Sequence, residues 1–205
     1  MDKELRENPH KFLSAEWYAW IHNNKLQIHE GFLSWTKTIK FESVLDVGCG
    51  KYDWYERKFK DKVYTGMDNF QEAINYHIKR HDHGSWIYQD IEKGDVLIKS
   101  DLVFSHSVID HSPDPDLFIR KSIEAANKYA YIMSYRGWFP NIDEHKIEHG
   151  KDGYCYNDIS VKQVRRLLNS LPCTYELKEF PTGLPEGEIQ SELHIVVTKE
   201  SAGNV

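Results

Sequence analysis

The chain has 205 residues, which is long enough for a single domain with one sizeable core. Its 26 lysines and arginines against 32 aspartates and glutamates give a net charge of −6, and this acidity disfavours nucleic acid as a partner, because phosphate binding needs a basic surface. No apolar run reaches the roughly 20 residues of a membrane span or forms a signal peptide, so a cytoplasmic protein without membrane contact is expected.

The first 41 residues are expected to form an N-terminal helical cap. Apolar residues between Phe12 and Ile21 recur at the spacing of one helix face, and a second helix is expected from Ile28 to Ile39. The main domain is then expected to span residues 42–200.

Strands and helices alternate through the main domain. Short apolar runs predict strands at 43–47, 63–67, 86–89, 102–105 and 129–134, and helices are expected at 53–60, 70–80, 115–128 and 160–170. Two late strands, at 175–180 and 194–198, have no helix between them and predict an antiparallel pair. This alternation predicts an α/β fold, in which a mostly parallel sheet is wrapped by helices.

Three of the expected strands end in residues that suit a nucleoside. Ligands of such sheets bind at the carboxyl ends of the strands. The first strand runs into Asp46-Val47-Gly48-Cys49-Gly50, where glycines let the backbone approach a ligand closely. Asp68 is placed to accept both ribose hydroxyls, and Asp90 to accept a hydrogen bond from an adenine amine. Each acid also has a structural interpretation, such as capping backbone donors at a strand end or starting a helix.

The glycine turn does not fit a dinucleotide. The dinucleotide pattern G-x-G-x-x-G needs a third glycine where this chain has Asp53, and that carboxylate would repel a pyrophosphate. An adenosine ligand without phosphate tolerates the charge. S-adenosylmethionine is such a ligand, and its sulfonium cation is attracted by nearby carboxylates.

These residues resemble the Rossmann-like (class I) S-adenosylmethionine-dependent methyltransferases. The stretch VLDVGCG matches the first motif of that family, Asp68 matches its ribose-binding acid, and YQDIE resembles its adenine loop. Residues 101–121 resemble its fourth strand and following loop, and the resemblance covers roughly residues 42–198. It implies a seven-stranded, mostly parallel sheet with an antiparallel last strand, and S-adenosylmethionine as cofactor. The cofactor-binding residues expected on this basis are Asp46, Gly48, Cys49, Gly50, Asp68, Asn69, Asp90, Ile91 and Ser105.

Four of the 11 histidines lie where the methyl acceptor is expected. His106 ends the fourth strand, His111 matches a histidine of the family's motif, and His145 and His149 lie in the insert after the fifth strand. Because the pKa of histidine is near neutral, His106, His111 and His145 are the catalytic candidates. A packing role remains an alternative to catalysis for His106, and ordering of the loop remains an alternative for His111. His145 and His149 have the spacing of metal ligands on a helix, but without a third ligand we expect no metal.

The other seven histidines are interpreted as ordinary packing or surface residues. His77, His81 and His83 are expected at the polar end of a helix and in the loop after it, and His194 at the start of a late strand. Cys49 is interpreted as a small apolar filler, because no cationic neighbour makes its thiol reactive.

Aromatic residues outside the strands indicate where the acceptor binds. The resemblance implies that the cap and an insert at about 135–158 form a lid, and the candidate substrate-binding residues are Tyr18, Arg136 and Trp138. Arg136 suits a carboxylate or phosphate on the acceptor. We expect O-methylation of a small polar molecule, namely a sugar, nucleotide-linked sugar or secondary metabolite, with nitrogen or carbon methylation as the next candidates.

Two other functions stay open. Lys51 and Tyr52 stand where many members of the family have glycine or a small residue, which favours a non-catalytic protein that binds a nucleoside or a partner. A nicotinamide oxidoreductase is the other alternative, and Asp53 argues against it. The sequence leaves the oligomeric state open.

Overall fold

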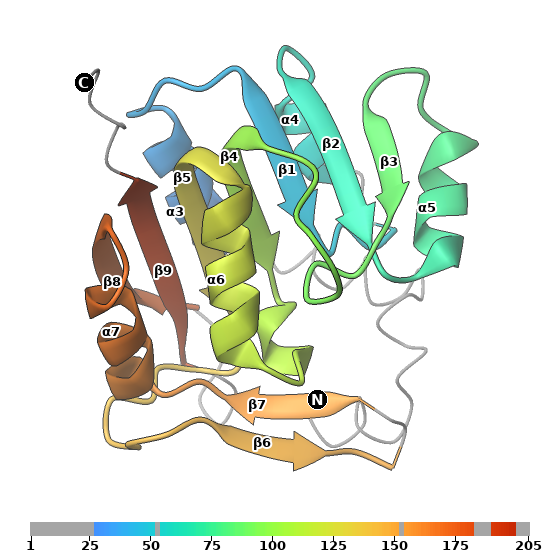
Figure 1. Ribbon diagram of the computed structural model, residues 1–205. Coiled ribbons are helices and arrows are strands. Elements are labelled where there is room, and N and C mark those ends of the chain that lie inside the picture. Colours follow the sequence, from blue (N-terminus) through green and yellow to red (C-terminus); the bar gives the residue numbers. More distant parts are fainter. Residues whose placement is uncertain (1–26, 52–53, 152–153, 183–189, 200–205) are drawn as a thin grey trace.

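Seven strands form the central sheet in the order β3-β2-β1-β4-β5-β9-β8 (Figure 1). The structure is a computed structural model that describes residues 27–51, 54–151, 154–182 and 190–199. The strands are β1 (Ser43–Val47), β2 (Val63–Asp68), β3 (Ser85–Tyr88), β4 (Ser100–His106), β5 (Ala126–Ser134), β8 (Cys173–Pro181) and β9 (Ser191–Lys199). Strands β1 to β5 pair in parallel, and β9 lies antiparallel between β5 and β8. The predicted mostly parallel sheet with an antiparallel last strand is confirmed.

Helices cover both faces of the sheet, and alternate strand residues pack against different helices. The helices are α3 (Gln27–Thr36), α4 (Trp54–Lys58), α5 (Gln71–Ile78), α6 (Pro115–Ala125) and α7 (Val161–Asn169). Leu102 and Phe104 of β4 pack in one core with Phe32 of α3, whereas Val103 packs in the other core with residues of α6 and α7. This alternation follows from the two-residue period of a strand. No helix among the described residues is long and apolar enough to cross a membrane.

Helix α6 ends earlier than the sequence predicts. The helix was expected to reach residue 128, but Ala126 has extended backbone angles and is already the first residue of β5. Ala126 pairs with Ser100 at the start of β4, and the register shifts between Ser100 and Leu102. Pairing with β4 therefore outweighs the helical pattern of the sequence at this position.

The insert after β5 contains a hairpin that the sequence analysis does not predict. Strands β6 (Lys146–His149) and β7 (Cys155–Asp158) pair antiparallel as a separate two-stranded sheet. Figure 1 shows the hairpin running across the carboxyl ends of the parallel strands, where ligands of such sheets bind. The side chains of β6 are exposed, and Cys155 to Asn157 of β7 are buried. Of the expected N-terminal cap, α3 is described, and residues 1–26 lie outside the described residues.

Helix α7 is amphipathic and begins at a serine cap, as expected. Its inward positions Val161, Val164, Leu167 and Leu168 are buried. The hydroxyl of Ser160 accepts a hydrogen bond from the backbone N–H of Gln163 (3.1 Å) and donates one to the carbonyl of Ile142 (2.7 Å).

Replacing Ser160 with alanine is expected to lower the free energy of unfolding by about 1–3 kcal/mol, because it removes the cap and the hydrogen bond to the carbonyl of Ile142. Ser160 is completely buried. Chemical denaturation measures the change. Ser170→Ala at the exposed opposite end of the helix is the control, and its expected change is below about 0.5 kcal/mol. Equal losses in the two variants would contradict the capping role.

Candidate functional site

The backbone makes a tight turn between β1 and α4, at the carboxyl edge of the sheet. Gly48 and Gly50 have φ angles of +77° and +54°, in the left-handed region that favours glycine. The backbone N–H groups of Gly48 and Cys49 donate to the carbonyl of Met67 at 2.7 and 3.1 Å, which joins the turn to β2. A Cβ atom on Gly48 would collide with Val108. The turn therefore needs a glycine both for its backbone angles and for its close approach to the loop after β4.

Asp68 connects this turn to the start of α5. One carboxylate oxygen of Asp68 accepts the N–H of Gly50 and the other accepts the N–H of Phe70, each at 2.8 Å. Burial raises the pKa of Asp68, and the two backbone hydrogen bonds lower it. Both of the interpretations made from the sequence are thus compatible, because a carboxylate oxygen that accepts one bond can accept a second from a ligand hydroxyl.

Asp46 is a buried carboxyl group next to the turn. Its side chain accepts a hydrogen bond from the hydroxyl of Tyr64 at 2.5 Å, and the residue is only 3% exposed. Burial raises the pKa of Asp46 from 3.8 to about 7, although the Tyr64 bond opposes the rise, and the charge of Asp68 adds to it. The two acids at adjacent strand ends therefore favour a positively charged ligand, whose presence would lower both pKa values.

The residues after β3 lie beside the backbone of Asp68. The backbone N–H of Gln89 donates to the carbonyl of Asp68 at 3.0 Å. Asp90 accepts the N–H of Glu92 at 3.0 Å and forms an ion pair with Lys93 at 3.2 Å, and Ile91 is buried. Asn69 is exposed directly after Asp68. Ser105 is fully buried in β4, and its hydroxyl has no hydrogen-bond partner among the described residues. Cys49 is buried, and burial raises the pKa of its thiol.

His77 is buried, contrary to its interpretation as part of a polar helix end. The residue is 0% exposed, and its Nε2 atom lies 2.9 Å from the carbonyl oxygen of Gly50 in the turn. The helical period gave a signal, because Ala73, Ile74 and His77 have the spacing of one face of α5 and are all buried. His81 also lies largely inside, next to the buried carboxylate of Glu56.

His106 and His111 lie near the carboxyl end of β4. Nδ1 of His106 is 3.3 Å from the hydroxyl of Tyr55. Nδ1 of His111 is 2.8 Å from the carbonyl oxygen of Cys155 in β7. A carbonyl only accepts, so Nδ1 of His111 carries a proton, and Nε2 is the nitrogen that can take another. The rings of Tyr135, Tyr154 and Tyr156 surround His111 at centroid distances of 6.0, 6.2 and 5.5 Å.

Asn157 of β7 fixes the loop that carries His111, and it is absent from the sequence-based site. Its side-chain amide donates to the carbonyls of Ile109 and Ser112 at 2.9 and 2.7 Å, on either side of His111. The residue is completely buried. Strand β7 therefore holds both the backbone of this loop and the ring of His111. Asn157 lies in the hairpin β6–β7, far along the chain from the loop that it holds.

Two further buried acids lie at the same edge, and both are absent from the sequence-based site. Asp110 accepts hydrogen bonds from the Ser134 hydroxyl (2.6 Å) and from the backbone N–H groups of Tyr135 and Arg136. Glu192 stands at the beginning of β9, which lies at this edge because β9 runs antiparallel. Burial raises the pKa of both acids, and the charge of Asp110 raises that of Glu192 further.

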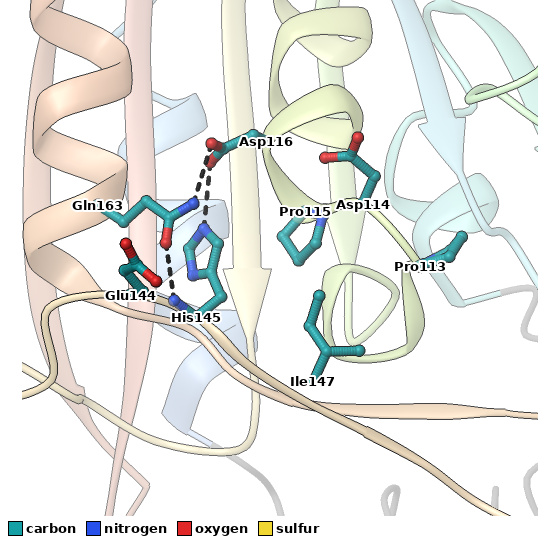
Figure 2. A pocket seen from close by; sticks show the side chains of 8 residues that line it. All are labelled: Pro113, Asp114, Pro115, Asp116, Glu144, His145, Ile147 and Gln163. Atoms are coloured by element: carbon teal, nitrogen blue, oxygen red, sulfur yellow. Dashed lines mark hydrogen bonds and ion pairs between the residues drawn. The ribbon is translucent and has the colours of Figure 1, made fainter.

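His145 lies in a different place, beside a hollow of about 390 Å³ (Figure 2). Its Nδ1 accepts the backbone N–H of Ser160 at 2.9 Å, so Nε2 carries the proton and donates to Asp116 at 3.1 Å. Gln163 donates to the same carboxylate at 3.0 Å and accepts the N–H of His145 at 2.7 Å. Burial lowers the pKa of His145, although Asp116 opposes this. Both nitrogens thus hold the insert to α6 and α7, and catalysis by His145 stays a prediction that these contacts do not support.

The remaining predicted residues have varied positions. The guanidinium of Arg136 pairs with Asp158 at 3.2 Å, and Trp138 packs against the core formed with α6 and α7. Tyr18 lies outside the described residues. His149 is in strand β6, so the helical spacing considered for His145 and His149 does not apply. The described part of the chain holds no group of three or more histidine, cysteine or acidic residues arranged for a metal ion.

Comparisons with known proteins identify the family and the fold of the chain. Residues 40–178 match the family model described as a methyltransferase domain. The magnesium protoporphyrin IX methyltransferase of Synechocystis PCC 6803, solved with bound SAM, has a similar fold with a TM-score of 0.64 and 13% identity over 93% of this chain and 94% of that one. The 1,6-didemethyltoxoflavin-N1-methyltransferase of Burkholderia thailandensis has a TM-score of 0.61 and 15% identity over 95% and 87%. The N-methyltransferase NodS of Bradyrhizobium japonicum WM9 has a TM-score of 0.56 and 18% sequence identity, and the match covers 80% of each chain. The search of curated proteins found no match.

The raised pKa of Asp46 predicts how stability depends on pH. A pKa raised from 3.8 to about 7 means that the folded state binds the proton more tightly, so the stabilisation is complete at low pH and is lost as pH rises through 7. The free energy of unfolding of the wild type, minus that of Asp46→Asn, is therefore expected to fall by about 1 kcal/mol per pH unit between about pH 5 and about pH 7.

Denaturant titrations across this range measure the difference. The control is Asp61→Asn, which changes an exposed carboxylate whose side chain is 71% accessible, and its curve should run parallel to that of the wild type. A difference between wild type and Asp46→Asn that stays constant with pH would contradict the raised pKa.

Proposed function

The chain belongs to the methyltransferase-domain family, and we propose that it transfers the methyl group of S-adenosylmethionine to a small polar molecule. The observation that carries this proposal is the hydrogen bond between the N–H of Gly50 and the carboxylate of Asp68, which joins the glycine turn to the acid of the next strand. A turn and an acid held in this way fit an adenosine whose ribose lies at Asp68. Asp90 and Ile91, which follow the next strand, would then border the adenine.

The charge of the site supports a cationic cofactor. Asp46 and Asp68 are both poorly exposed, and burial raises the pKa of each, so the pair has unfavourable electrostatics without a nearby cation. S-adenosylmethionine carries a sulfonium and an ammonium group and has no phosphate. When bound, it supplies a methyl group that is already activated for in-line displacement.

The residues of this chain then have three tasks. The glycine turn and Asp68 hold the cofactor, the hairpin β6–β7 covers the acceptor side and limits water, and a histidine accepts the acceptor's proton. We assign that last role to His111, because the carbonyl of Cys155 fixes the proton on Nδ1 and leaves Nε2 as the basic atom. His106, at the end of β4, is the second candidate for the base.

The acceptor class is a finer part of the proposal. The sequence favours an oxygen of a sugar, nucleotide-linked sugar or secondary metabolite. A specific observation favours a nitrogen acceptor as the second candidate: the acceptor edge holds the buried acids Asp110 and Glu192 together with the tyrosine rings around His111. Carboxylates and aromatic faces both attract an amine cation. Two of the similar structures are also named as nitrogen methyltransferases.

Cofactor binding is the first test. Calorimetry with S-adenosylhomocysteine is expected to show binding to the wild type and at least about tenfold weaker binding to Asp68→Ala, because the variant loses the acceptors for the ribose hydroxyls. Asp61→Ala, which removes an exposed acid, serves as control and should bind like the wild type. NADH should not bind. A folded wild-type protein that ignores S-adenosylhomocysteine would refute the proposal.

Methyl transfer is the second test. A panel of sugars, nucleotide sugars and small amines is incubated with S-adenosylmethionine, and the release of S-adenosylhomocysteine is measured. With the acceptor that reacts, His111→Ala is expected to lower kcat by about 10²–10⁴-fold, because it removes the base. Its affinity for S-adenosylhomocysteine should be unchanged. A folded protein that binds the cofactor but methylates no acceptor would favour the non-catalytic alternative.

A further inference from the structure

Gly50 is held by side chains at both of its backbone polar groups. Its N–H donates to Asp68 at 2.8 Å, and its carbonyl oxygen lies 2.9 Å from Nε2 of His77. Since a carbonyl only accepts, Nε2 of His77 carries a proton and donates it. Asp68 ends β2 and His77 belongs to α5, so two separate elements fix Gly50. The φ of Gly50 is +54°, which lies outside the range of a regular helix or strand.

The ring of His77 has a single orientation because it is packed on several sides. It lies flat against Trp86 of β3, with ring centroids 3.9 Å apart and an angle of 5° between the planes. Trp86 in turn covers Gly66 of β2, where a Cβ atom would collide with the indole ring. The centroid of the His81 ring lies 5.4 Å from that of His77. Because packing already restricts rotation of the His77 ring, its hydrogen bond to Gly50 forms at little further cost in side-chain entropy.

The helix that follows the turn is attached to the loop after α5. Glu56 of α4 is 0% exposed, and its carboxylate lies 3.5 Å from Nδ1 of His81 and also contacts Nε2 of His83. A buried carboxylate is costly unless partners of this kind surround it. The end of α5 and the loop after it therefore support the last glycine of the turn and the helix beyond it.

From this geometry we propose that His77 is a positioning residue of the cofactor site, an inference that rests on the proposed function. Its hydrogen bond fixes the peptide plane that joins Gly50 to Lys51. The N–H of Gly50 lies in the preceding peptide plane, and the two planes meet at the Cα atom of Gly50. Holding one plane therefore limits rotation of the other and keeps that N–H directed at Asp68, whose carboxylate it orients together with the N–H of Phe70. Without the donor, the carbonyl of Gly50 loses its partner, the turn can rotate, and Asp68 is no longer presented to the ribose hydroxyls in one orientation.

Two variants separate the hydrogen bond from the packing. His77→Phe keeps a ring against Trp86 and removes the donor, whereas His77→Gln keeps an N–H donor and removes the ring. Calorimetry with S-adenosylhomocysteine is expected to give about tenfold weaker binding for His77→Phe, the effect of one lost hydrogen bond, and binding within about threefold of the wild type for His77→Gln. Should the phenylalanine variant not fold, His77→Met replaces it, because methionine also fills the space and lacks a donor.

A matched control is available at His194, which is also 0% exposed. Its ring stacks on Phe180, with centroids 4.8 Å apart, and its Nδ1 is 2.8 Å from the hydroxyl of Tyr131. It lies in β9, three strands away from β1 in the sheet order. His194→Phe is expected to lower the melting temperature without changing the affinity for S-adenosylhomocysteine, because its partners are remote from the turn.

The outcomes distinguish the inference from the function on which it rests. If the folded wild type does not bind S-adenosylhomocysteine, the proposed function fails, and the role of His77 fails with it. If the wild type binds and His77→Phe binds equally well, only the positioning role is refuted. Weak binding by His77→Gln together with tight binding by His77→Phe would assign the effect to ring packing and also overturn the proposal.

Discussion

The site depends on one hydrogen bond, from the N–H of Gly50 to the carboxylate of Asp68. It joins the turn after β1 to the end of β2, two segments that are brought together by parallel pairing of the strands. The bond fixes the backbone of the turn relative to the acid, and His77 holds the other side of the same glycine. The packing of α5 and β3 orders the turn before a ligand binds. Binding therefore carries little entropic cost for ordering the turn.

Buried carboxyl groups dominate the electrostatics of the carboxyl edge. Asp46 and Asp68 lie near the turn, and Asp110 and Glu192 lie beyond β4. Burial raises the pKa of all four. Such groups reduce stability when charged, so their accumulation at one edge is better explained by a ligand than by folding. The excess of acidic residues in the chain is thus also found locally, in the four acids at this edge. Their charge favours the binding of cations over that of phosphates.

The hairpin β6–β7 covers the side of the site where we propose that the acceptor binds. Cys155 and Asn157 in β7 hold the ring of His111 and the backbone around it. The insert is attached to the domain through His145, which bridges the starts of α6 and α7 (Figure 2). His145 thus has a structural role in the insert, and the contacts of β7 hold His111, in the loop after β4, in one orientation.

Local sequence alone determined the strand ends and the residues on them. An apolar β-branched run followed by Gly48-Cys49-Gly50 predicts a strand and a turn, because glycine adopts a φ such as the +77° of Gly48 more readily than other residues. The order of strands and helices predicts a parallel sheet, and this places Asp46, Asp68 and Asp90 at one edge. These inferences need only neighbouring residues and the general rules of sheet topology.

Tertiary structure decided which other side chains join them. His77 is 27 residues from Gly50, and Asn157 is 48 residues from Ile109, so no local pattern links either pair. Glu192 lies at this edge because β9 runs antiparallel to β5. The ring of His145 is fixed by hydrogen bonds to Asp116 in α6 and to the residue that precedes α7. Hydrophobic periodicity predicts that a side chain faces inward. Its hydrogen-bond partner depends on how distant elements pack together, and that packing is determined by the whole chain and not by any one segment.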